Sequence, residues 1–193
     1  KVAVEASIDK GCLFLKNRQN EDGSWGSPRQ TKGLNIFAPV PGSHRAFQLA
    51  VTALSTAALI ENKGDDPVYS KVIRRGEDHL LSRLSHLRRA TPMAIYNVWA
   101  HSFGLQALAR MKDRALAEKD ANGTRITRIN DLMQHQIGML QRYESIDGGW
   151  GYYDFNAQTK QPSGSSISFV NATGLVALRE AKEHDVNVPP KLV

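Results

Sequence analysis

A helical segment followed by a glycine-rich turn that ends in tryptophan occurs twice in this chain, and this repeated unit constrains the fold most. The first copy runs through residues 10–19 into Asp22-Gly23-Ser24-Trp25-Gly26. The second has Leu140 ahead of Asp147-Gly148-Gly149-Trp150-Gly151, and the two tryptophans are 125 positions apart. Midway, residues 75–80 repeat the helical part without the turn. A period of about 60 residues predicts an array of stacked supersecondary units.

Residues 10–25 fit the pattern Lys-Gly-x2-Phe-Leu-x3-Gln-x3-Gly-x-Trp, which resembles the QW repeat of the terpenoid cyclase and protein prenyltransferase superfamily. The wider spacing, closed by residues 168–178, is similar to the bacterial prenyltransferase and squalene oxidase repeat proteins. The resemblance implies an α/α-toroid in which outer and inner helices alternate. It assigns the repeat turns to Gln19, Gly23, Trp25, Gly148 and Trp150.

We therefore predict an all-α fold, a toroid segment of about three outer–inner helix pairs in one domain over residues 1–193. The repeat units cover about 1–64, 65–120 and 121–193, and helices are expected at about 7–18, 43–62, from 67, 93–114, 125–143 and 168–184. Asp66-Pro67 and Thr91-Pro92 are helix start signals, since each pairs an N-cap with proline at the first helical position. Ser7 is the expected N-cap of the first helix, and residues 188–193 resemble the start of a seventh.

Composition excludes several classes of protein. The longest apolar run, residues 49–60, is shorter than the roughly 20 residues that cross a bilayer, so we expect no membrane span. The net charge of +6 comes with acidic residues interspersed among the arginines, so nucleic-acid binding is not expected. The single Cys12 excludes an internal disulfide and a cysteine-based zinc cluster, and it is expected in the core. The chain starts without methionine, which leaves a removed targeting segment and the localisation open.

The resemblance also implies chemistries whose residues are missing here. Terpene cyclases of the superfamily use an Asp-x-Asp-Asp acid, which does not occur in this sequence, and Asp65-Asp66 precedes Pro67 as a helix cap. The zinc set of protein prenyltransferases and the Gly-Cys-Gly-Glu-Gln thioester motif do not occur either. We therefore expect no metal and no cofactor.

A ligand pocket is the remaining functional prediction. In toroids of this kind the beginnings of the inner helices surround a central cavity, and the matching positions here are Arg45, Tyr96, Asn97, His101 and Asn171, with Asp154 as the nearest lone acid. Asn97 and His101 share a helix face at i, i+4. The competing interpretation is structural, because buried polar groups satisfy one another or the helix ends.

The two tryptophans have the same two interpretations. An exposed indole would offer an aromatic face to a carbohydrate or lipid. In a QW-type repeat, however, the indole packs on its helix end and ties one unit to the next. We favour this second interpretation for Trp25 and Trp150.

The leading hypothesis is a non-catalytic module that binds an apolar or polymeric ligand, or another protein, on the concave side formed by inner helices. One alternative is a partial terpene-cyclase-like enzyme, similar to squalene-hopene cyclase, whose acid lies outside this segment. A weaker one is a polysaccharide-acting toroid with Asp154, Tyr152 and Arg45 along a groove. A closed toroid needs about ten to twelve helices and this chain offers about six, so the remainder of its own chain or a second subunit is expected to complete the ring.

Overall fold

The structure is a computed structural model that describes residues 2–29, 41–89, 94–118, 123–154, 161–164 and 166–192. Within these ranges the only β-type pairing is one isolated bridge, Ala94 to Tyr153, and the prediction of an all-α fold is confirmed. The helices are α1 (Val2–Arg18), α2 (Pro41–Lys63), α3 (Pro67–Arg83), α4 (Asn97–Ala117), α5 (Thr124–Tyr143) and α6 (Ser168–Glu183), with the 3₁₀ helices η1 (Leu84–His86) and η2 (Pro190–Leu192).

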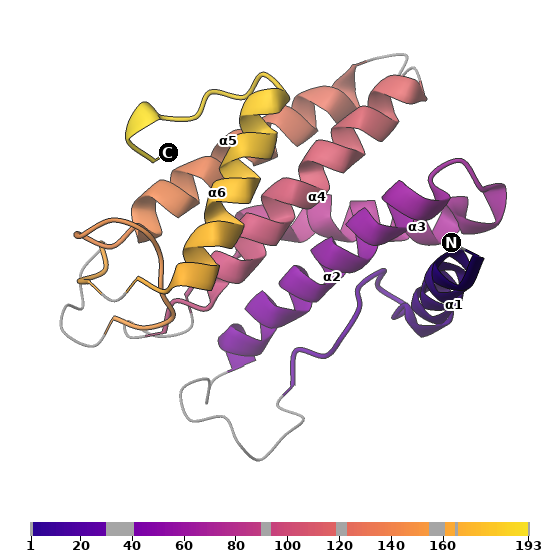
Figure 1. The fold of residues 1–193 in the computed structure, drawn as a ribbon, viewed down its shortest axis with the longest axis horizontal. Helices are drawn as coiled ribbons and strands as arrows, with labels where there is room; N and C mark the ends of the chain where they lie inside the picture. The colour runs from indigo at the N-terminus through magenta and orange to yellow at the C-terminus, as the bar shows by residue number, and fades with distance from the viewer. Residues whose placement is uncertain are drawn as a thin grey trace.

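The helices lie in two layers with α4 at the centre. Figure 1 shows α2, α4 and α6 side by side, with α3 and α5 behind them and α1 at the edge. Helix α4 packs against α2 and α6 in its own layer and against α5 behind it, while α3 packs against α2. Its side chains Leu105, Leu108 and Met111 are fully buried, so α4 carries the middle of the core.

Some helix boundaries follow local signals. The Asp66 carboxylate accepts a hydrogen bond from the Val68 amide at 2.9 Å, and Pro67 is the first helical residue, so this predicted start is confirmed. Helix α1 begins at Val2, earlier than expected, because the Ser7 hydroxyl donates back to the Ala3 carbonyl inside the helix instead of capping it.

The start of α4 was predicted wrongly. The helix begins at Asn97, not at Met93, because the Ile95 amide donates to the Tyr152 carbonyl at 2.8 Å. This pairing with a distant segment holds residues 94–95 extended. The proposed start signal at Thr91-Pro92 lies outside the described residues. At the other end, residues 190–192 form η2, and Leu192 is buried, so only one 3₁₀ turn stands where a seventh helix was expected.

The first helix is the least buried one. Cys12 is 4% exposed, which confirms its place in the core, whereas Ile8 on the same helix is 41% exposed. Cys12 packs with Trp25, Leu59 and Ile73 in a small cluster separate from the main core. Helix α1 is therefore attached through a narrow apolar contact.

The two Gly-Trp turns are built alike. The indole nitrogen of Trp25 donates to the Leu15 carbonyl, and that of Trp150 donates to the Leu140 carbonyl, both at 2.8 Å. Gly23 and Gly148 have φ values of 86° and 89°, a left-handed conformation that glycine adopts without strain. Both indoles are 2% exposed, so neither offers a face to a ligand.

Further contacts tie each turn to a neighbouring helix. The Gln19 amide donates to Gly23 within the turn and to the Val72 carbonyl of α3 at 2.8 Å. The Trp25 ring lies against Gly76 of α3, and the Trp150 ring lies against Gly174 of α6. A helix end, a turn and an adjacent helix are thereby joined at both places.

Candidate ligand-binding surface

Aromatic side chains gather where the central-layer helices begin. Within the described residues, seven rings form one contiguous group through centroid distances of 6.0 Å or less. We call this group the aromatic surface. It consists of Phe47 on α2, Tyr96, Trp99 and Phe103 at the start of α4, Tyr152 and Tyr153 after the second turn, and Phe169 on α6. None of the seven is buried, and Phe169 is 53% exposed.

Tyr96 and Trp99 connect the rest of the aromatic surface. The centroid of Tyr96 lies 5.0 Å from that of Phe47 and 5.3 Å from that of Tyr153. Trp99 stacks on Phe103 at 5.5 Å and on Phe169 at 6.0 Å. These spacings fall in the range in which aromatic pairs attract one another. The rings therefore hold each other in place while keeping part of their area open.

Helical spacing and backbone pairing explain why these rings meet. Trp99 and Phe103 are four residues apart, so they lie on one face of α4. The segment that carries Tyr152 is held at the start of α4 by the bond from the Ile95 amide. The start of α6 is fixed to the same segment, because the Ile167 amide donates to the Trp150 carbonyl at 2.8 Å.

Two tyrosines of the aromatic surface, Tyr96 and Tyr152, stay uncharged. The Tyr96 and Tyr153 hydroxyls are hydrogen-bonded to each other. Burial, together with this hydrogen bond, raises the pKa of Tyr96 far above its usual value, and burial raises the pKa of Tyr152 as well. The seven side chains thus present an apolar face with a few hydroxyl groups.

Two of the sequence-predicted site residues lie beneath this surface in a buried polar network. The His101 ring is fully buried, and its Nδ1 lies 2.7 Å from the Gln136 side-chain oxygen of α5. Its Nε2 lies 3.3 Å from the Asn97 amide nitrogen. Desolvation lowers the pKa of His101 to about 4, so the ring is neutral at pH 7. Nδ1 then donates and Nε2 accepts, while Asn97 Oδ1 and Gln136 Nε2 are buried without a hydrogen-bond partner among the described residues.

Asn171, a third predicted site residue, caps the second turn. Its side-chain oxygen accepts a hydrogen bond from the Trp150 amide at 2.6 Å. Thr52 does the same at the first turn, where its hydroxyl accepts from the Trp25 amide at 3.0 Å. The two hydrogen bonds occupy matching places in the two Gly-Trp turns, so the role of Asn171 is to stabilise the second turn.

Asp154 and Arg45 are not part of the aromatic surface. Asp154 is fully buried, where Oδ1 accepts from the Ser163 hydroxyl at 3.0 Å and Oδ2 lies 3.8 Å from an Arg89 nitrogen. Arg45 is exposed and lines a different pocket, whose described lining contains neither Asp154 nor Tyr152. Of the six candidates, the structure thus puts only Tyr96 in the aromatic surface.

Ion pairs link α2, α4 and α6 toward the ends of these helices that lie away from the aromatic surface. The Arg110 guanidinium on α4 donates to both carboxylate oxygens of Glu180 on α6, at 2.7 and 3.2 Å, and it pairs with Glu61 on α2. The layer of α2, α4 and α6 is therefore polar and cross-linked at one end and aromatic at the other.

From the sequence, Tyr96 was expected at a cavity and Tyr152 along a groove, but the other five rings of the aromatic surface were not among the predicted site residues. The surface contains seven of the 14 aromatic residues of the chain, which has three tryptophans, five tyrosines and six phenylalanines. The close spacing of Tyr96, Trp99 and Phe103 at the start of an expected inner helix was the available signal.

Metal sites and membrane-spanning helices are both missing among the residues that the structure describes. These residues contain no group of three or more His, Cys, Asp or Glu side chains arranged to hold a metal ion. None of their helices combines the length and apolarity that a bilayer crossing demands. The chain matches no protein-family model, no curated protein and no solved structure.

Proposed function

We propose that this protein is a non-catalytic helical-repeat module that binds an apolar ligand on its aromatic surface. The observation that carries the proposal is the cluster of seven partly exposed aromatic rings where α2, α4 and α6 begin. Clustered apolar groups left open to solvent commonly mark binding sites. Burial of the open ring area against a ligand removes apolar surface from water, which favours an apolar ligand.

Neighbouring apolar side chains extend the same layer. Val51 and Leu54 on α2 are 43% and 46% exposed, and Val176 on α6 is 47% exposed. The ligand would thus find apolar contacts along the helices as well as at their beginnings. A long flexible hydrocarbon fits this arrangement better than a compact polar molecule.

A toroid-type architecture belongs to this proposal. Its support is the pair of similarly built Gly-Trp turns, the layer of α2, α4 and α6 against α3 and α5, and the resemblance of residues 10–25 to the QW repeat. In that architecture the aromatic surface faces the central cavity of a superfamily known for terpenoid cyclases and protein prenyltransferases.

A cyclase-like enzyme remains a proposal with less support. It needs an acid directed at the aromatic surface, and Asp154 was the sequence candidate. This carboxylate is fully buried and accepts from Ser163, so we assign it to the structure of the loop.

The test is the binding of a neutral apolar probe. Nile red should bind with enhanced fluorescence, and squalene should displace it. Phe169→Ala should weaken dye binding about fivefold, because burying the exposed part of a phenylalanine contributes about 1 kcal/mol. Phe14→Ala is the matched control, since Phe14 is 60% exposed on the distant α1.

Two results would refute the proposed function. One is the absence of dye binding by the wild-type protein. The other is an equal effect of Phe169→Ala and Phe14→Ala, which would mean that the dye adsorbs to any exposed ring.

A further inference from the structure

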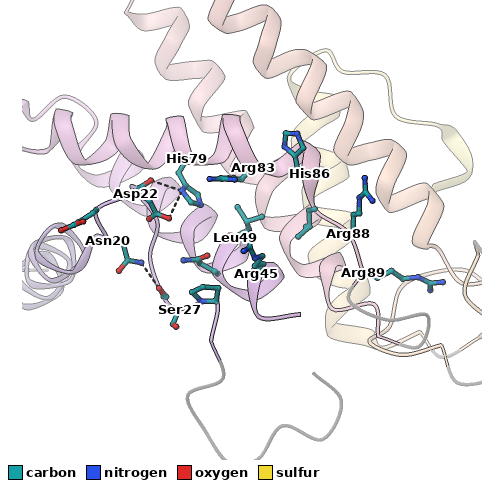
Figure 2. Close-up of a pocket in the computed structure, with 15 residues that line it drawn as sticks. Asn20, Asp22, Ser27, Arg45, Leu49, His79, Arg83, His86, Arg88 and Arg89 are labelled. Carbon is teal, nitrogen blue, oxygen red and sulfur yellow. Dashed lines mark hydrogen bonds and ion pairs between the residues drawn. The ribbon is translucent and has the colours of Figure 1, made fainter. Parts of the chain in front are cut away.

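A second pocket, rich in arginine, lies on the other side of the start of α2. Arg45 lines this pocket, whereas Phe47, two residues later on α2, belongs to the aromatic surface. The two lie on different sides of α2, because helical residues two apart point in nearly opposite directions. The pocket has a volume of about 910 Å³. Figure 2 shows it between the first Gly-Trp turn, α2, and the end of α3 with η1.

Three arginines of this basic pocket are available to a ligand. Arg45 comes from α2, Arg83 ends α3, and Arg88 follows η1, and all three are exposed. Within the described residues no hydrogen bond or ion pair engages their guanidinium groups. Arg89 is different, since it lies near Asp154 and over the Tyr143 ring.

The acidic residues of the pocket lie in the Gly-Trp turn, at the end near Arg83, and, although desolvation opposes it, the Arg83 guanidinium helps to lower the pKa of Asp22. Asp22 is occupied there, because its Oδ1 accepts from the Ser24 amide at 3.0 Å and its Oδ2 lies 3.7 Å from His79 Nδ1. Glu21, its neighbour, belongs to the same turn. Arg45 and Arg88 lie away from this turn in Figure 2, so that end of the pocket keeps a positive charge.

The arrangement of the three arginines indicates the shape of the anion. In Figure 2 their side chains are spread along the pocket and do not converge on one point. A single small anion such as phosphate is held best by donors that converge on it. Spread arginines suit an extended chain that presents several carboxylates.

The other residues that line the pocket favour a peptide over a nucleic acid as the ligand. The described lining residues include no phenylalanine, tyrosine or tryptophan, which single-stranded nucleic acids use as stacking platforms. Leu49 and Leu87, each 6% exposed, form the small apolar part of the lining. Both features fit a peptide.

We propose that this basic pocket binds an acidic peptide segment of a partner protein, whose carboxylates pair with Arg45, Arg83 and Arg88. The ion pairs are charge-assisted hydrogen bonds of the kind that arginine makes well with carboxylates. The inference does not depend on the aromatic surface, because it uses other residues and a ligand of opposite character.

The experiment measures fluorescence anisotropy of a labelled hexaglutamate peptide at low and physiological salt. The triple variant Arg45→Gln, Arg83→Gln, Arg88→Gln should weaken binding about tenfold or more, since each exposed pair adds a small increment. The matched control is Arg18→Gln, Arg142→Gln, Arg179→Gln, which removes the same charge from exposed positions outside the pocket and should change affinity less than about twofold. Circular dichroism verifies that both variants fold.

Competing probes give the outcomes that overturn the proposal. It fails if the wild-type protein does not bind the peptide, or if the two triple variants lose affinity equally, which would indicate attraction by net charge alone. It also fails if an oligouridylate of equal charge binds more tightly at the same arginines, or if inorganic pyrophosphate alone occupies the site.

Discussion

At the scale of a single residue, the role of His101 expected from the sequence differs from its role in the structure. In the sequence it shares a helix face with Asn97, which is the spacing of a small polar site. In the folded chain it is fully buried, bonded to Gln136 and stacked near Tyr143 at 5.8 Å. The residue that decides between these roles is Gln136, which lies 35 positions away on α5. No local pattern links the two.

Acid should destabilise the protein through His101. The folded ring has a pKa of about 4, whereas an unfolded histidine titrates near 6.5. Between these values the unfolded chain takes up a proton that the folded chain does not, so the free energy of unfolding decreases as the pH falls. The expected contribution is about 3 kcal/mol over this window.

Urea unfolding of the wild type and of His101→Gln, followed by circular dichroism, measures this contribution. The difference in unfolding free energy between the two proteins should shrink as the pH is lowered from about 7 to about 4. Parallel curves would show that His101 protonates equally well in the folded protein.

At the scale of secondary-structure elements, a glycine can decide how closely two helices approach each other. Gly11 and Gly76 occupy matching positions in two copies of the sequence repeat, yet their surroundings differ. A Cβ added at Gly11 would meet nothing within 4 Å, whereas one at Gly76 would lie 2.6 Å from the Thr56 hydroxyl and 3.0 Å from the Trp25 ring. Gly76 thus allows α3 to approach the first turn and α2.

The two glycines should respond oppositely to alanine. Gly11→Ala should stabilise the protein by about 0.5–1 kcal/mol, because alanine is the better helix former. Gly76→Ala should destabilise it by about 1–3 kcal/mol, because the indole cannot move aside in a packed core. Thermal and urea unfolding report both changes, and Gly138→Ala on α5, with open space around it, is a second control. Stabilisation by Gly76→Ala would mean that the contact is loose.

The helices were largely predictable from the sequence, and the site was not. Asp66-Pro67 specified the start of α3 through local hydrogen bonding, and apolar periodicity located the other helices. The start of α4 escaped prediction because the bond between Ile95 and Tyr152 is a tertiary contact. The aromatic surface escaped for the same reason: its rings come from three helices and a loop, and only the fold shows which of them remain open.

At the scale of the whole molecule, one buried carboxylate joins three helices. Glu77 on α3 is 1% exposed and lies 2.9 Å from Arg114 on α4 and 2.6 Å from Arg125 on α5. Arg74, one turn earlier on α3, lies 3.4 Å away. This ion cluster spans the two layers, since α4 belongs to the central layer and α3 and α5 to the layer behind it.

Removing the charge of Glu77 should therefore weaken the fold as a whole. Glu77→Gln preserves the volume but leaves the Arg114 guanidinium, which is nearly buried, with less compensation, and breaking a buried pair in this way costs about 3–5 kcal/mol. Glu183→Gln is the control, because its pair with Arg179 on α6 is exposed and should contribute nothing measurable. Urea unfolding followed by both circular dichroism and tryptophan fluorescence should show one shared transition at lower urea for Glu77→Gln. Two separate transitions would instead mean that the layers unfold independently and that Glu77 stabilises only its own neighbourhood.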